Sequence, residues 1–172
     1  MAERVSLRDY QRELAERLKQ AGSAGTASKL AVQAGAERWL VDMAEANEVI
    51  PVPQITPVAQ TRGWFKGLAN VRGNLYSVVD FPAFLGGTPV PLTEQARLLL
   101  VADRFRASTA LLINGSLGLR NPAQMKARER AGQAQEPAPW LRAEYVDEAG
   151  GAWKELDLAV LVRDESFLVV GT

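Results

Sequence analysis

Short apolar runs, separated by turn signals at spacings of about eight to twelve residues, constrain the fold of this 172-residue chain more than any other feature. From Lys29 onward these runs are rich in β-branched and aromatic residues, and glycines or prolines interrupt them. Few segments in this part of the chain follow the three-to-four-residue period of an amphipathic helix. The pattern therefore indicates a mainly β protein, built as closed antiparallel barrels or as a sandwich.

Two hairpin-rich halves meet near residue 90, and each half predicts one small barrel. We expect the first barrel mainly from residues 38–87 and the second mainly from residues 95–170, with a strand near Lys29 crossing over to complete the second. Two apolar runs flank Arg72-Gly73-Asn74, where the Gly-Asn pair predicts a tight hairpin turn. Residues 167–170 predict a final strand. Apolar patterning predicts that seven side chains are buried: Trp39, Leu40, Val78, Val79, Leu99, Leu112 and Leu168.

The beginning of the chain has a different pattern. Residues 1–22 predict a helical extension, because apolar side chains recur there at spacings of three and four and form one narrow stripe, consisting of Leu7, Tyr10, Leu14 and Leu18. Small residues at 23–28 predict a linker, and residues 29–172 form the main domain. Such a stripe docks either on its own domain or on a partner, and both alternatives stay open.

Missing residue types exclude most catalytic chemistry. The chain contains no cysteine and no histidine, which excludes disulfides, thiolate nucleophiles, imidazole bases and Ser-His-Asp catalysis. Carboxylates such as Glu45 and Glu48 are sequence neighbours, but nothing in the sequence separates their pKa values as acid–base catalysis requires. Calcium-loop, Walker and dinucleotide-binding spacings are absent from the sequence. We therefore expect no enzyme, no cofactor and no metal.

Charge and hydropathy limit the possible partners and the location. Twenty basic and twenty acidic side chains cancel, so no overall field would hold nucleic acid. The first residues are too charged for a secretory signal, and no apolar run approaches the roughly 18 residues of a membrane span. We expect a cytoplasmic protein with no direct membrane insertion. A basic stretch at 120–130 and an acidic stretch at 144–165 form either solvated faces or oppositely charged contact regions.

One segment, residues 64–73, has the composition of a binding site. It places aromatic residues, two glycines and one arginine around a tight strand turn. Gly67 and Gly73 permit unusual backbone angles or a close backbone approach. Arg72 is either an interface anchor or a group that bonds the turn carbonyls, and the residues alone do not separate these readings.

The run from residue 38 to residue 87 resembles the CheW-like family of bacterial chemosensory coupling proteins. The resemblance is carried by NEVIPVP and WFKGLANVRGNLYSVVDFPAFLG, in which glycines, arginine and aspartate keep their offsets together. The matching positions are Glu48-Val49, Gly67, Asn70, Arg72-Gly73 and Val78-Val79-Asp80. Phe81 replaces the usual leucine. The resemblance is looser over the rest of residues 29–170, where Asn114 stands at a position at which aspartate is frequent.

The resemblance implies two SH3-like barrels packed together and an adaptor without an active site. Such an adaptor connects the cytoplasmic tip of a methyl-accepting chemoreceptor to the regulatory domain of a CheA-type histidine kinase. Kinase contact is expected at the barrel ends and receptor contact in the groove between the barrels. The implied partner-binding residues are Glu48, Val49, Gly67, Leu68, Asn70, Arg72 and Gly73.

Two further features resemble the members of this family that serve type IV pilus twitching motility. They are the predicted N-terminal helix and the loop NPAQM at residues 121–125. One alternative within the same class is a flagellar chemotaxis coupling protein. An alternative from a different class is a small-ligand-binding β-barrel, which would require a deep pocket with convergent polar groups.

Overall fold

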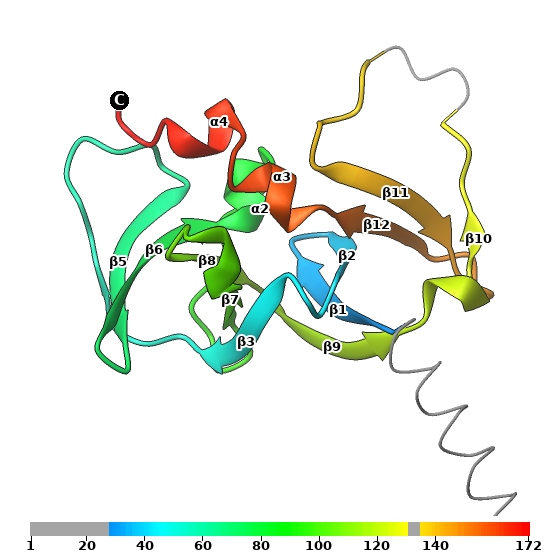
Figure 1. Ribbon diagram of the computed structural model, residues 1–172, viewed down its shortest axis with the longest axis horizontal. Helices are drawn as coiled ribbons and strands as arrows, with labels where there is room; N and C mark the ends of the chain where they lie inside the picture. The colour runs from blue at the N-terminus through cyan, green and yellow to red at the C-terminus, as the bar shows by residue number, and fades with distance from the viewer. Residues whose placement is uncertain (1–27, 131–134) are drawn as a thin grey trace, which may run out of the picture.

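The computed structural model describes residues 28–130 and 135–172, which form two six-stranded sheets with a few short helices (Figure 1). The helical extension expected over residues 1–22, and the expected linker except for its last residue, lie outside the described residues. The mainly β class is confirmed.

The first sheet, on the right in Figure 1, has the strand order β10-β11-β12-β2-β1-β9. Its strands are β1 (Lys29–Ala34), β2 (Glu37–Val41), β9 (Gly115–Arg120), β10 (Lys126–Ala127), β11 (Leu141–Val146) and β12 (Ala152–Leu156). All neighbours pair antiparallel except β12 and β2, which run parallel. The strand that begins at Lys29 crosses over to the later part of the chain, since β1 pairs with β9 (residues 115–120) as well as with its sequence neighbour β2.

The second sheet, on the left in Figure 1, has the order β3-β7-β8-β6-β5-β4. Its strands are β3 (Ala46–Pro51), β4 (Ile55–Thr56), β5 (Phe65–Val71), β6 (Asn74–Asp80), β7 (Arg97–Val101) and β8 (Thr109–Ile113). Here β6 and β8 pair in parallel. The chain leaves β6 through a helical turn and a proline-containing loop, and it returns as the β7–β8 hairpin, which brings β8 alongside β6 in the same direction.

The expectation of closed antiparallel barrels needs correction. Each sheet contains one parallel pair, and in each the strand order ends in two edge strands within the described part of the chain. The strands are also divided differently from the expected halves, because β2 lies in the first sheet whereas β7 and β8 lie in the second. Pairing between strands far apart in the sequence determines this division, and local patterns do not encode it.

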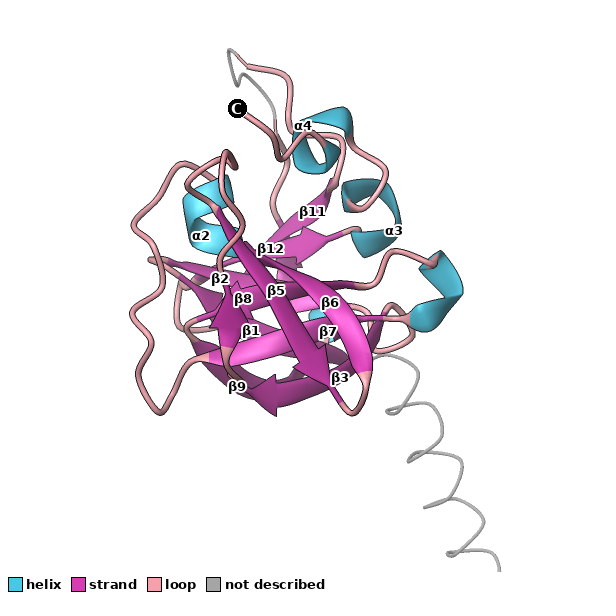
Figure 2. Cartoon of the chain, turned by 90° about the vertical axis from the view of Figure 1, so that its left-hand side faces the viewer, coloured by secondary structure: helices cyan, strands magenta, loops and turns pink. Residues whose placement is uncertain are grey.

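The main core lies between the sheets and is covered at one end by three short helices, which appear in the upper part of Figure 2. The helices are α2 (Phe81–Phe84), α3 (Leu158–Leu161) and α4 (Glu165–Leu168), and 3-10 turns occupy Asp103–Phe105 and Pro122–Gln124. Alternate residues of β7 enter different clusters: Leu99 packs in the main core and Leu98 in a second core of its own sheet. This central strand is therefore apolar on both faces.

Six of the seven side chains expected to be buried are buried, and Leu168 is the exception at 58% exposure. The expectation of a final strand at residues 167–170 is also wrong, because the helix α4 occupies residues 165–168. Asp164 caps this helix by accepting a hydrogen bond from the Ser166 backbone N–H at 2.9 Å. The helical turn directs Phe167 into the main core and leaves Leu168 in solvent.

The basic and acidic stretches meet within the chain. Strand β10 pairs with β11 in the first sheet, and the Arg128 backbone N–H donates to the Glu144 carbonyl at 2.8 Å. Arg130 and Glu144 form an ion pair, with 3.5 Å between Nε and Oε2. Part of the charge asymmetry in the sequence is therefore balanced at this sheet edge. None of the helices in residues 28–130 and 135–172 is long and apolar enough to cross a membrane.

Candidate functional site

The turn that joins β5 to β6 holds Arg72 in an uncommon backbone conformation. Arg72 and Gly73 are the two central residues of the turn, with φ of 52° and 87°. Two positive φ values are characteristic of a type I′ hairpin. Asn70 supports the turn, because its Oδ1 accepts a hydrogen bond from the Gly73 backbone N–H at 2.9 Å. The hairpin expected around Arg72-Gly73-Asn74 is confirmed, and its two central residues are Arg72 and Gly73, since Asn74 already pairs with Val71.

Arg72 binds Glu48 through two parallel hydrogen bonds. Arg72 Nη1 lies 2.7 Å from Glu48 Oε2, and Nη2 lies 2.7 Å from Oε1. The side chains are 69% and 40% exposed, so the pair lies at the surface. The Arg72 hydrogen bonds hold the pKa of the Glu48 carboxyl below its ordinary value. Because Glu48 belongs to β3, the pair connects the hairpin tip to an edge strand of the same sheet. The described bonds of this guanidinium go to a carboxylate, not to the turn carbonyls.

Gly67 has a structural role in the same hairpin. Its φ is 126°, and a Cβ there would overlap the Thr56 carbonyl oxygen and lie 2.9 Å from the Pro57 Cα. The glycine sits at a register shift between β5 and β6 and is buried. Its missing side chain lets β4 approach β5. Gly67 therefore has a structural role, since it leaves the space that the Thr56 carbonyl group of β4 occupies.

Leu68 and Val49 occupy different surroundings. Leu68 lines a hollow of about 430 Å³ between β4 and the β5–β6 hairpin, together with Asn70 and the exposed Leu75. Val49 follows Glu48 on β3, so its side chain points to the opposite face of the strand, and it packs against the main core. The structure thus brings Glu48, Arg72, Asn70 and the Leu68 hollow to one side of the second sheet.

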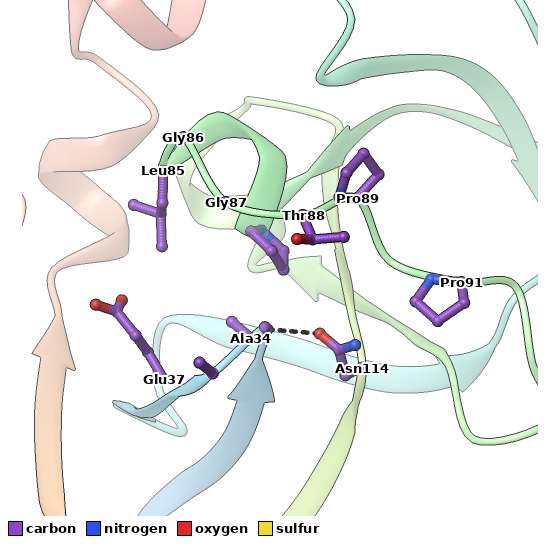
Figure 3. Close-up of a pocket in the computed structure, with 12 residues that line it drawn as sticks. Ala34, Glu37, Leu85, Gly86, Gly87, Thr88, Pro89, Pro91 and Asn114 are labelled. Atoms are coloured by element: carbon purple, nitrogen blue, oxygen red, sulfur yellow. Dashed lines mark hydrogen bonds between the residues drawn. The ribbon is translucent and has the colours of Figure 1, made fainter.

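A larger hollow of about 680 Å³ lies where the two sheets meet (Figure 3). The β1–β2 turn lines it on one side, and α2 with the loop that follows it lines the other. Asn114 lies between β8 and β9, where the chain passes from one sheet to the other, and its Oδ1 accepts a hydrogen bond from the Gly35 backbone N–H at 2.6 Å. The residue that departs from the family pattern therefore fixes one wall of this hollow.

Asp80, which belongs to the family motif, positions α2 and the loop after it, which line the opposite side of the hollow. This carboxylate is fully buried. Its Oδ1 accepts a hydrogen bond from the Ala83 N–H at 3.1 Å and caps α2, and its Oδ2 accepts one from the Val90 N–H at 2.9 Å. Lys66 Nζ lies 3.7 Å from Oδ2. The sequence carried a signal for this role, because an aspartate shortly before a proline is a common helix start.

Sequence reasoning missed a second arginine–carboxylate cluster, centred on Arg142 of β11. Arg142 Nη2 lies 2.8 Å from Glu45 Oε1 and 2.9 Å from Asp157 Oδ2, and Nη1 lies 3.4 Å from Glu155 Oε1. Glu45 and Glu155 are buried. Glu45 Oε2 also accepts a hydrogen bond from the Leu158 N–H at the start of α3, at 3.0 Å. The Arg142 cluster therefore ties the β2–β3 connection to β11, β12 and α3.

Burial and hydrogen bonding shift two pKa values in the Arg142 cluster. Burial alone would lower the pKa of Arg142, but its hydrogen bonds to Glu45 and Asp157 outweigh burial and raise it. Burial raises the pKa of Tyr145 to about 12, helped by the hydrogen bond from its hydroxyl to Glu155 Oε2 at 2.8 Å. Glu45 and Glu48, considered above as a carboxylate pair, bind different arginines, so no paired acid and base form there.

Comparisons with known proteins found one matching family and a related sequence. Residues 29–166 match the model of the CheW-like domain family. Protein PilI of Pseudomonas aeruginosa is 31% identical over 94 residues, which make up 55% of this chain and 52% of that protein. The match thus spans about half the length of this relative.

A solved structure shares the fold. The crystal structure of the scaffolding protein TtCheW from Thermoanaerobacter tengcongensis superposes with a TM-score of 0.61 at 12% identity, covering 76% of this chain and 88% of that one. The family model covers most of the described chain, and the resemblance seen in residues 38–87 is confirmed. This chain belongs to the CheW-like domain family.

Proposed function

We propose that this protein is a non-catalytic adaptor that couples the cytoplasmic tip of a methyl-accepting chemoreceptor to the regulatory domain of a CheA-type histidine kinase. Membership of the CheW-like family supports the proposal, as does the fold shared with a scaffolding protein. The 31% identity to PilI supports an output in type IV pilus twitching motility rather than in flagellar chemotaxis. Such an adaptor would act in the cytoplasm.

The observation that carries the proposal is the exposed Arg72–Glu48 pair. Surface ion pairs contribute only about 0 to 1 kcal/mol to stability. A side chain at positive φ adds backbone strain. An arginine held in such a turn and fixed by two hydrogen bonds is therefore better explained by recognition than by stability.

The surroundings of this pair suit a protein partner. Arg72 has five N–H donors, of which Glu48 occupies two, so further donors remain for a partner's carbonyl or carboxylate groups. The Leu68 hollow beside the hairpin offers apolar contact. An orientated guanidinium next to a small apolar surface has the composition of an interface hot spot.

The implied binding residues divide into two kinds in this proposal. Glu48, Arg72 and Leu68 contact the partner directly. Asn70, Gly73 and Gly67 give the hairpin its shape, and Val49 supports β3 from the core side. The hollow between the sheets, bounded by the β1–β2 turn, α2 and Asn114, is the surface that we assign to the receptor groove. Kinase contact is assigned to the strand ends at the hairpin.

Substitution of Arg72 tests the proposal. We expect Arg72→Ala to weaken binding to the receptor tip or to the kinase regulatory domain by about 1 to 3 kcal/mol, while the melting temperature changes little. Isothermal titration against each partner fragment measures the first effect. Arg106→Ala is a matched control for the loss of an arginine at positive φ, because Arg106 has a φ of 53° and belongs to the β7–β8 connection, outside the β5–β6 turn. Parent-like binding by folded Arg72→Ala would remove this residue from the interface.

A further inference from the structure

A small hollow of about 200 Å³ lies between the start of β1, the β2–β3 connection and β3. It is lined by Leu30 at the start of β1, Met43 in the β2–β3 connection, and residues 46–49 of β3. Its lining is largely aliphatic, and Met43 is 51% exposed. A large apolar side chain at the mouth of an apolar hollow leaves surface that burial would stabilise.

The chain itself supplies a nearby apolar segment. Strand β1 begins at Lys29, one residue before Leu30, so residues 1–27 join the fold at the rim of this hollow. In Figure 1 the blue start of β1 and the strand β3 both lie on the lower side of the molecule. Leu18 precedes Lys29 by eleven residues, and the covalent geometry of eleven residues limits their separation to at most roughly 36–40 Å.

We propose that the apolar stripe of residues 7–18 docks in cis on this hollow, with Leu14 or Leu18 entering between Leu30, Met43 and Val49. The hollow has room for an aliphatic side chain of this kind and not for a whole helix, so the rest of the stripe lies against the exposed face of Met43. A short tether keeps the segment at a high local concentration, which favours the intramolecular contact over a contact with another molecule.

The docked segment would lie beside the recognition pair, because Glu48 lines the same hollow. The inference does not depend on the proposed coupling function. It concerns only which surface the N-terminal stripe covers, and it is tested without any receptor or kinase.

The absence of cysteine makes a direct test possible. Met43→Cys places a single thiol at the mouth of the hollow in the full-length chain, and a soluble disulfide reagent reports its accessibility. We expect labelling to become about tenfold faster when Leu14→Ser and Leu18→Ser are added, which corresponds to about 1.4 kcal/mol of docking free energy. Adding Glu13→Ser and Arg17→Ser instead, on the charged side of the same segment, should leave the rate unchanged.

Two controls keep the test decisive. Leu168→Cys places a thiol at a similarly exposed leucine on α4, at the opposite end of the molecule in both views, and its labelling should not respond to the stripe substitutions. Oxidation of the pair Leu18→Cys with Met43→Cys should give an intrachain disulfide, whereas Leu18→Cys with Leu168→Cys should not. Equal Met43→Cys labelling in all three backgrounds would overturn the proposal. Protection that disappears on dilution would also overturn it, because the occupant would then be a second copy.

Discussion

Two arginine–carboxylate sites in this protein use the same chemistry in opposite environments. Arg72 binds Glu48 at the surface, where both side chains remain well exposed. Arg142 binds Glu45 and Glu155, whose side chains are only 8% and 4% exposed. Water screens the first site, whereas the carboxylates of the second have lost their hydration and depend on the arginine.

Burial, and not hydrogen-bond geometry, separates the architectural ion pairs of Arg142 from the exposed pair that we propose for recognition. The Arg72 pair has the better geometry, with two hydrogen bonds of 2.7 Å. Yet its removal leaves no buried charge behind. The Arg142 cluster connects segments from both ends of the domain, and its removal would leave two buried carboxylates with fewer partners.

The largest expected effect is the loss of stability on removing Arg142. We expect Arg142→Ala to lower the free energy of unfolding by about 3 kcal/mol, because Glu45 would remain buried without its cation. This value lies at the lower end of the range for breaking a buried ion pair. Glu155 would keep a cation, because Lys29 Nζ lies 3.0 Å from its Oε1. Urea unfolding measures the change. A loss below about 1 kcal/mol would contradict the prediction, because Arg142 would then contribute as little to stability as an exposed ion pair does.

A smaller effect is expected from Tyr145 at high pH. Its pKa in the folded protein is about 12 against an ordinary value of 10.0, so folding favours the protonated phenol. The stability that this shift contributes is fully present below pH 10 and is lost as the pH rises from 10 to 12. We expect stability to fall less steeply across this window in Tyr145→Phe than in the parent. Identical slopes in urea titrations of the two proteins would contradict the raised pKa of Tyr145, to which burial contributes most and the Glu155 hydrogen bond second.

The smallest expected effect concerns the stability contribution of Glu48. Its pKa in the folded protein lies below the ordinary 4.5, so the pair's contribution is present above that pH and is lost as the pH falls through the folded value. Because the pair is exposed, we expect Glu48→Gln to leave thermal unfolding at neutral pH nearly unchanged. A marked fall in melting temperature would show that this pair, too, is architectural.

The strands could be predicted from the sequence because their signals are local. Apolar runs located β1, β2, β3, β7 and β8, and glycine marked the β5–β6 hairpin. The positive φ of Arg72 was not predicted, because no local pattern requires an arginine to adopt that conformation. The apolar run at residues 167–170 predicts a strand when it is considered alone. Asp164 caps a helix that begins at Glu165, and this helix includes the first two residues of the run.

Contacts between distant residues could not be predicted in the same way. Glu48 and Arg72 were placed on one surface only through the family resemblance. Glu45 and Arg142, separated by 97 residues, meet because β12 pairs in parallel with β2, and no local pattern carries that information. The same holds for Asn114 and Gly35, which meet across the junction of the two sheets.

Exchange of the two charges tests the central claim most directly, namely that partners recognise the guanidinium at position 72 itself. The double variant Glu48→Arg with Arg72→Glu keeps an arginine–carboxylate pair between the hairpin and β3 but reverses its direction. Titration calorimetry against the receptor tip and the kinase regulatory domain, with thermal unfolding alongside, is the measurement. The account predicts a double variant with parent-like unfolding that binds at least one partner as poorly as Arg72→Ala. Parent-like affinity of the exchanged protein for both partners would contradict it, because the pair would then act only as a bridge between strands.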